Sequence, residues 1–275
     1  LNIAIAIYVM TLPGALDGVL YYITPDFSKL SFGTIIAALG QLFYSMSLAM
    51  GIMFTYGSYL NKKENLEASV RHIELFDTGI AFLSGLMILP AVFVFSGGDA
   101  NVLNSGSSLL FITMPQVFMS MPFGQAVGAI FFILVFFAAL TSAISFVETI
   151  VSVFQDQFGW KRIPICIGTC LGAIVIGLAA AWGFGWWSGF TIFGMNISDF
   201  LDFFTNSILM PISALFTCIF LGFIVGTSVV ADEVKLSSRF RSEKMFVVIT
   251  KWIAPVCIVA ILVTSILSAA GLFTI

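Results

Sequence analysis

Long runs of apolar residues alternate with short polar stretches along the chain, and this pattern predicts membrane-spanning helices. Six apolar runs, beginning at Gly33, each meet the length of about 20 residues that a spanning helix needs. A backbone in hydrocarbon must satisfy its own hydrogen bonds, so these runs are predicted to be helical. A shorter run ends at Pro13-Gly14, and we interpret it as the end of a helix severed by the start of the chain.

The pattern divides a single transmembrane domain, residues 1–275, into nine parts. They are the end of a severed helix at 1–13, an outer loop at 14–32, a broken helix with a central unwound stretch at 33–60, a helix at 73–96, short outer-loop helices at 106–119, and helices at 123–154, 163–187, 200–230 and 245–275.

Composition supports an all-α, polytopic membrane protein. Apolar residues make up 60% of the chain and charged residues 9%, with a mean hydropathy of +1.09. A soluble domain carries roughly 25% charged residues. The bilayer is therefore the expected surrounding. The net charge of -3 is spread along the chain, which gives no basic patch and no indication of a nucleic-acid partner.

The distribution of lysine and arginine predicts the orientation in the membrane. Ten of the eleven fall in alternate polar connections, and Lys29 is the exception. The positive-inside rule makes those connections cytoplasmic. We therefore expect a multi-pass protein of the plasma (inner) membrane, with its C-terminus outside.

Small and polar residues interrupt the apolar run at 33–60 near its middle, in Tyr44-Ser45-Met46-Ser47-Leu48-Ala49-Met50-Gly51. Glycine weakens a helix by about 1 kcal/mol relative to alanine, and serine hydroxyls can bond freed backbone groups. One interpretation is local unwinding, which would leave carbonyls and amides to bind a polar ligand. The other is a small-residue face that packs against a neighbouring helix.

A second polar cluster lies in the run at 123–154. The carbonyl of Ala138 lies one turn before the hydroxyls of Thr141 and Ser142. Three such oxygens could bind a small hard cation, which prefers oxygen ligands. Alternatively, the two hydroxyls only bond back to the preceding turn.

Three carboxylates, Asp77, Glu148 and Asp202, fall within predicted spanning helices. A charge near the bilayer centre costs at least about 2.5 kcal/mol. Because no lysine or arginine within these helices could form a structural pair, a functional role is favoured. No nucleophile–base pair, metal cluster or phosphate loop indicates an enzyme.

These features occur in an order that resembles the neurotransmitter:sodium symporter family, especially its bacterial amino-acid members. The resembling stretches cover nearly the whole chain. They are Leu12-Pro13-Gly14-Ala15, Pro25-Asp26-Phe27-Ser28-Lys29-Leu30, Gly40-Gln41-Leu42-Phe43, Thr55-Tyr56-Gly57-Ser58-Tyr59, residues 77–93, and Leu140-Thr141-Ser142-Ala143.

The resemblance implies a LeuT-like inverted-repeat transporter fold. It places the start of this chain late in the fifth helix, with the second repeat complete and the first mostly missing. The earlier helices of the same protein are then expected partners, because in the family the first helix supplies part of both sodium sites and of the substrate site.

The resemblance also implies roles for individual residues. Two Na⁺ sites are expected in the full-length protein, the first with Ser45 and Asp77 and the second with Ala138 (by its carbonyl), Thr141 and Ser142. The substrate site is implied to contain Tyr44, Ser45, Ser47, Met50, Ser142 and Phe146. Implied gate residues are Asp202 on the outer side and Asp156, Ser58 and Tyr59 on the inner side.

Two positions depart from the commoner family pattern. Ala49 stands where Gly is usual, which bears on the size of the pocket. Asp77 stands where many members have Asn, and Ala81, one turn later, carries no acid. The Asp77 carboxylate could then supply the charge that chloride supplies in some relatives, so chloride is not expected. It could also carry a proton back in the empty state.

The sequence therefore predicts sodium-coupled symport of an amino acid by alternating access, with possible proton antiport. Tyr44, Met50 and Phe146 favour a neutral substrate with an apolar or aromatic side chain. The alternatives are a transporter of the same architecture for another solute, a non-transporting scaffold or channel-like subunit, and an inactive truncated fragment. The oxygen ligands at mid-membrane depth argue against the scaffold.

Overall fold

The computed structural model describes residues 1–96, 109–237 and 239–269. It divides into two compact units, Leu1–Lys29 with His72–Ser142 and Leu30–Arg71 with Ala143–Ile275. The boundary runs through two long helices, α5 (Leu66–Ser96) and α7 (Gly124–Phe158). Each unit is described below by itself.

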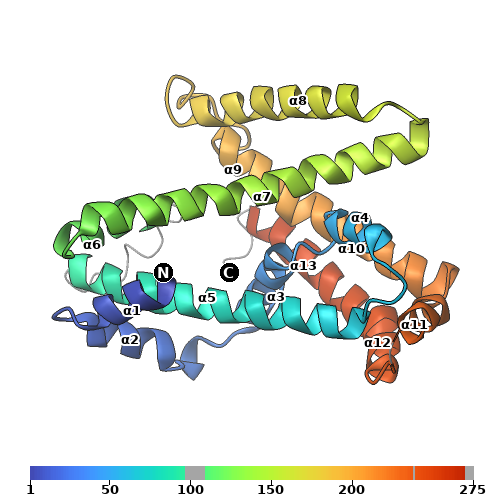
Figure 1. Ribbon diagram of the computed structural model, residues 1–275, viewed down its shortest axis with the longest axis horizontal. Helices are drawn as coiled ribbons and strands as arrows, with labels where there is room; N and C mark the ends of the chain where they lie inside the picture. The colour runs from blue at the N-terminus through green and yellow to red at the C-terminus, as the bar shows by residue number, and fades with distance from the viewer. Residues whose placement is uncertain (97–108, 238, 270–275) are drawn as a thin grey trace. The chain divides into compact units, whose positions relative to one another are not determined.

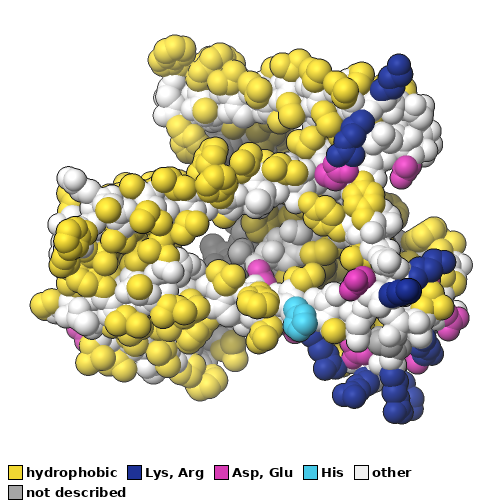
Figure 2. Space-filling model, viewed as in Figure 1, with side chains coloured by type: hydrophobic (Ala, Val, Ile, Leu, Met, Phe, Trp, Pro, Cys, Tyr) yellow, Lys and Arg dark blue, Asp and Glu magenta, His cyan; other side chains and the backbone are white. Residues whose placement is uncertain are grey.

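Five helical segments in the described part of the chain are long and apolar enough to cross a membrane. A sixth results if the bent pair α1 (Asn2–Met10) and α2 (Ala15–Ile23) counts as one span. The five are Leu66–Ser96, Gly124–Phe158, Arg162–Gly183, Ile197–Ile224 and Glu243–Ser268. Exposed hydrophobic side chains cover much of the surface in Figure 2, as expected where lipid is the solvent.

In the first unit, the stretch expected to be an outer loop at 14–32 contains the helix α2. Gly14 (φ 86°) adopts a left-handed conformation, and α2 leaves α1 at an angle of 116°. The run from Ala15 to Ile23 is apolar enough to form a helix that packs on α5: a Cβ at Gly18 would lie 2.6 Å from the Cα of Pro90. Glycine is what permits this close approach.

The core of the first unit joins α1, α5, α6 (Met114–Ser120) and α7. Ile5, Val9, Met87, Met114 and Phe131 are among its buried members. The Tyr8 hydroxyl donates to the carbonyl of Ser120 at 2.6 Å, which ties α1 to the end of α6.

The helix expected at 73–96 begins earlier, at Leu66. The side chain of Asn65 accepts a hydrogen bond from the amide of Ala68 at 3.0 Å, and Arg71 pairs with Glu67 one turn before it at 2.9 Å. A cap and an i,i+4 pair extend a helix into polar sequence. The expected start of this helix, at residue 73, was therefore too late.

The short helices expected at 106–119 lie partly outside the described residues, which resume at 109. From there π-helical turns at Leu109–Thr113 continue directly into α6. Together they form one short helical segment, and Pro115 lies at the junction where α6 begins.

In the second unit, α13 runs beside α10, as Figure 1 shows, and also contacts α3. Between α7 and α9, α8 follows a tight connection, and Gly183 at its end packs against Ile197. The helices of this unit are α3 (Phe32–Ser45), α4 (Ile52–Tyr59), α8 (Arg162–Gly183), α9 (Ile197–Asp202), α10 (Met210–Ile219), α11 (Thr227–Lys235), α12 (Glu243–Val248) and α13 (Ala254–Ala269).

The segment expected to be one helix at 200–230 is not uniform. α9 passes through π-helical turns (Phe203–Leu209) into α10, and further π-helical turns end at Ile224. Gly226 (φ 92°) then breaks the helix before α11, so its end was predicted too late. The helix expected at 245–275 begins two residues earlier, and 270–275 lie outside the described residues.

Candidate functional site

The helix α3 ends at the polar cluster because its last turn closes in a Schellman motif. The amide of Leu48 bonds the carbonyl of Phe43, and the amide of Ser47 bonds that of Tyr44, both at 3.0 Å. Ser47 has φ 53°, the left-handed conformation that this motif requires. These bonds satisfy carbonyls at the end of α3 and turn the chain out of the helix.

The six residues from Met46 to Gly51 are not helical, and α4 begins at Ile52. Ala49 (φ 63°) and Gly51 (φ 81°) are also left-handed. Such a backbone costs a non-glycine residue roughly 1–2 kcal/mol. At Gly51 space matters too, since a Cβ there would lie 2.8 Å from Cγ2 of Thr149 on α7.

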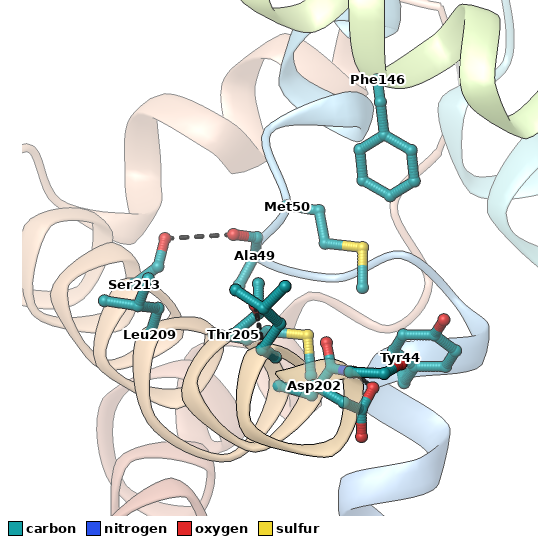
Figure 3. Close-up of a pocket in the computed structure, with 12 residues that line it drawn as sticks. Tyr44, Ala49, Met50, Phe146, Asp202, Thr205, Leu209 and Ser213 are labelled. Atoms are coloured by element: carbon teal, nitrogen blue, oxygen red, sulfur yellow. Dashed lines mark hydrogen bonds between the residues drawn. The ribbon is translucent and has the colours of Figure 1, made fainter. Parts of the chain in front are cut away.

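A side chain from α10 holds the non-helical stretch. The hydroxyl of Ser213 donates to the carbonyl of Ala49 at 3.1 Å, drawn as a dashed line in Figure 3. The neighbouring backbone cannot supply a helical donor to this carbonyl because the helix is interrupted there. The bond fixes the non-helical stretch to α10.

A cavity of about 520 Å³ lies beside this stretch, within the second unit. In Figure 3 the ring of Phe146 extends from α7 toward the thioether of Met50, and Tyr44 and Asp202 lie on the other side. The volume is in the range of small-ligand sites. The lining residues are Tyr44, Ala49, Met50, Phe146, Ser198, Leu201, Asp202, Thr205, Asn206, Leu209, Met210 and Ser213.

The cavity brings together four residues that the sequence singled out, namely Tyr44, Met50, Phe146 and Asp202. Two other expected substrate residues, Ser45 and Ser47, lie on the same stretch, but neither is among the described residues that line the cavity. Ser142 belongs to the first unit.

Sequence reasoning missed the wall that α9, the π-helical turns and α10 supply. Its polar members are Ser198, Thr205, Asn206 and Ser213. A signal was present, because the lining positions recur every three or four residues from Ser198 through Ser213, as one face of a helix does. Asp202 alone was recognised on that face.

Asp202, the expected outer-gate residue, accepts a hydrogen bond from the side-chain amide of Asn206 at 2.6 Å. Asn206 follows it by one turn and also lines the cavity. The bond orients the carboxylate at the cavity wall, where it can accept further hydrogen bonds.

In the first unit, the hydroxyls of Thr141 and Ser142 both donate to the carbonyl of Ala138, at 2.9 Å and 3.2 Å. These are the bonds to the preceding turn that formed the alternative interpretation. They also bring three oxygens together within one turn of α7. A donating hydroxyl keeps its lone pairs, so the set fits a hard cation such as sodium.

The two residues expected at the first sodium site lie on separate elements. Ser45 is the last residue of α3, and Asp77 is a half-buried residue of α5. A side-chain oxygen at the end of a helix, such as that of Ser45, is well placed to bind an ion, because the last carbonyls of a helix have no intrahelical hydrogen-bond donor.

At the end of α4 the expected inner-gate residue Tyr59 has a definite partner. Its hydroxyl donates to Glu148 at 2.8 Å, and the same oxygen of Glu148 accepts from Arg162 at 3.0 Å. The second guanidinium nitrogen of Arg162 contacts the other carboxylate oxygen. The expectation concerned cations within the helices that carry the three carboxylates. The partner of Glu148 comes instead from the start of α8, so a functional role of Glu148 no longer follows from the lack of a pair.

The other two inner-gate residues are less constrained. The Ser58 hydroxyl bonds back to the carbonyl of Thr55 at 2.7 Å. Asp156, exposed near the end of α7, makes no ion pair or side-chain hydrogen bond with the described part of the chain.

Comparison with known proteins identifies the family of this chain. The model of the sodium:neurotransmitter symporter family matches residues 1–273. An uncharacterized sodium-dependent transporter of Haemophilus influenzae is 35% identical over 261 residues, which are 93% of this chain and 55% of that protein. One of Bacillus subtilis is 35% identical over 84% of this chain and 50% of its own length.

A solved structure, that of MhsT in complex with L-phenylalanine, matches with a TM-score of 0.88. The two are 34% identical, and the match covers 96% of this chain and 59% of MhsT. The chain thus spans about half the length of the curated relatives it matches. The all-helical, polytopic fold is that of MhsT over the matched region, and the chain belongs to the sodium:neurotransmitter symporter family.

Proposed function

We propose that the complete protein is a sodium-coupled symporter of a neutral amino acid with an apolar or aromatic side chain. Family membership supports the class of activity. The observation that carries the substrate assignment is the cavity beside the break between α3 and α4, which is lined by apolar and polar side chains next to a non-helical stretch of backbone.

The cavity has the two kinds of surface that an amino acid needs. Tyr44, Met50 and Phe146 supply aromatic and thioether surface for a side chain. The non-helical stretch beside them supplies amides and carbonyls for the charged amino and carboxylate groups, as broken helices do in transporters. MhsT, whose structure was solved with L-phenylalanine, supports a substrate of this size.

Sodium would act as a co-substrate at two sites. The resemblance assigns Ser45 and Asp77 to the first, and the oxygens of Ala138, Thr141 and Ser142 to the second. Ions and amino acid that together stabilise an occluded state, which neither stabilises alone, are coupled by linkage. Sodium entering down its gradient would then drive the amino acid inward through alternating access.

Asp77 gives this cycle two further proposed properties. While sodium is bound, the negative charge of the Asp77 carboxylate would offset the positive charge of the ion, so that chloride is not required. In the return step without sodium and substrate, a proton could take the place of the ion on Asp77. Each cycle would then carry sodium inward and a proton outward. Asp202 and Asp156 would close the outer and inner gates.

The positive-inside rule supports a place in the plasma (inner) membrane with the C-terminus outside. The lysines and arginines at the ends of α4, α8 and α12 would then be cytoplasmic.

Equilibrium binding of radiolabelled L-phenylalanine to the purified complete protein, in sodium or potassium chloride, tests the proposal. Burial of the side chain of the bound phenylalanine contributes about 1.5–3 kcal/mol to the binding free energy. Contact with the ring of Phe146 in the cavity wall supplies part of this contribution. Phe146→Ala should therefore weaken sodium-dependent binding about tenfold. Phe136→Ala, at an exposed position of the same helix, is the matched control and should leave binding unchanged.

The other candidate functions predict different results. A non-transporting scaffold would bind no amino acid in either salt. A transporter of another solute would show sodium-dependent stabilisation without phenylalanine binding. An inactive truncated fragment would be distinguished by comparing residues 1–275 alone with the complete protein.

A further inference from the structure

A second hollow, of about 220 Å³, lies within the second unit, away from the substrate cavity residues. It forms where the start of α5 meets the segment between α11 and α12. Figure 2 shows several Lys and Arg side chains gathered near α11 and α12. The lining residues are Asn65, Glu67, Ala68, Arg71, Arg239 and Arg241.

Three arginines and one glutamate line the hollow, and the carboxylate of that glutamate is already engaged. Glu67 accepts from the Arg71 guanidinium at 2.9 Å, from the backbone amide of Arg241 at 3.1 Å and from the Ser242 hydroxyl at 3.4 Å. Glu67 thereby holds the α11–α12 segment against α5. No carboxylate in the described ranges pairs with the side chains of Arg239 or Arg241, so the hollow keeps a net positive charge.

The helix itself adds to this field. Asn65 caps α5, and Ala68 lies in its first turn, so both line the hollow at the positive end of a 31-residue helix. Guanidinium groups that converge with a helix N-terminus favour a ligand with several anionic oxygens, since the forked N–H donors match phosphate geometry.

The position of the hollow indicates which kind of molecule would carry the anionic oxygens. Two membrane-spanning segments, Leu66–Ser96 and Glu243–Ser268, both begin beside it. Exposed apolar side chains stand next to it in sequence, with Val70 58% and Met245 60% exposed. A basic hollow between the ends of spanning helices, flanked by apolar surface, matches a phospholipid at the membrane edge.

We propose that Arg71, Arg239 and Arg241 bind the phosphate group of an anionic membrane phospholipid. The lipid would reinforce the contact that Glu67 makes between α5 and the α11–α12 segment, because its phosphate spans guanidinium groups from both. The acyl chains would lie along the exposed apolar side chains of the adjoining helices.

The test measures binding of short-chain phosphatidylglycerol to the complete protein in neutral detergent micelles by native mass spectrometry. Arg239→Gln with Arg241→Gln removes two guanidinium groups and should weaken binding about tenfold. Lys62→Gln with Lys63→Gln removes the same charge from the connection just before α5, outside the hollow, and should change binding less than about twofold. Arg239→Lys with Arg241→Lys keeps the charge without the forked donors and should give an intermediate loss.

Two further arms identify the ligand. Short-chain phosphatidylcholine, which carries the same phosphate without net charge, should bind more weakly, and millimolar inorganic phosphate should not displace phosphatidylglycerol. Equal losses in the arginine and lysine pairs would overturn the proposal, since they would indicate a diffuse electrostatic attraction. Displacement of the lipid by millimolar inorganic phosphate would overturn it in favour of a free-phosphate site.

Discussion

Replacing Gly51 with alanine tests how the non-helical stretch is held in shape. Gly51 has φ 81°, and a Cβ at this position would lie 2.8 Å from Cγ2 of Thr149. The left-handed backbone costs alanine roughly 1–2 kcal/mol. Thr149 is buried, and its hydroxyl bonds the carbonyl of Ser145 at 2.9 Å. Turning it aside forfeits about 0.5–1.5 kcal/mol.

These two costs are partly offset in the unfolded chain, where alanine has less conformational freedom than glycine by about 0.4–1 kcal/mol. Gly51→Ala should therefore destabilise the protein by about 2 kcal/mol. Thr149→Ser removes the methyl group that the new Cβ would meet but keeps the hydroxyl. The double variant should recover the steric part of the loss, about 1 kcal/mol, and retain the backbone part.

The assay is unfolding of the complete protein with SDS in mixed micelles, together with sodium-dependent phenylalanine binding. Gly57→Ala is the control, because Gly57 is a helical residue of α4 with nothing within 4 Å of an added Cβ. It should stabilise the helix by about 1 kcal/mol. The reasoning would be refuted if Gly51→Ala unfolded like the parent, or if Thr149→Ser restored nothing.

Three further predictions concern the ions and the gate. Thr141→Ala with Ser142→Ala removes two oxygens from the second sodium site and should weaken the apparent sodium affinity at least about tenfold. Thr264→Ala, which removes a similar hydroxyl bond to the preceding turn on α13, is the control and should leave the sodium affinity unchanged. An unchanged sodium dependence in the double variant would show that the hydroxyls of Thr141 and Ser142 only pack. Asp202→Asn should impair occlusion in cysteine-accessibility measurements while the protein stays folded, and parental opening and closing would contradict the outer-gate role. Uptake should survive replacement of chloride by gluconate and rise with internal acidity, and Asp77→Asn should lose the pH response; strict chloride dependence of the parent would overturn charge compensation by Asp77.

The apolar pattern was enough to predict an all-helical membrane fold, because spanning length and backbone hydrogen bonding leave few alternatives in lipid. The family comparison confirmed this fold class and the resemblance. Helix ends in polar sequence were harder to predict. The sequence around the start of α5 contains a capping residue, Asn65, and an i,i+4 ion pair between Glu67 and Arg71, but its polar composition was interpreted as a loop. The break at Gly226 depends on one residue inside an apolar run.

Within the site, the small and polar residues predicted the interruption between positions 44 and 51, whereas Tyr44 and Met50 were assigned to the substrate site by the family resemblance. The wall from Ser198 to Ser213 was missed although its lining positions recur at helical spacing, because that spacing marks one face of a helix without saying what the face contacts. The pairing of Glu148 with Arg162 depends on how α8 folds back on α7, which local sequence does not specify.

Transport itself is the most direct test of the central claim, that this chain is part of a sodium-driven amino-acid symporter. The complete protein, reconstituted in proteoliposomes, should accumulate radiolabelled L-phenylalanine above its external concentration when an inward sodium gradient is imposed. The accumulated label should leave when a sodium ionophore collapses the gradient. Equal uptake with choline in place of sodium, or uptake that never exceeds equilibration, would contradict the account.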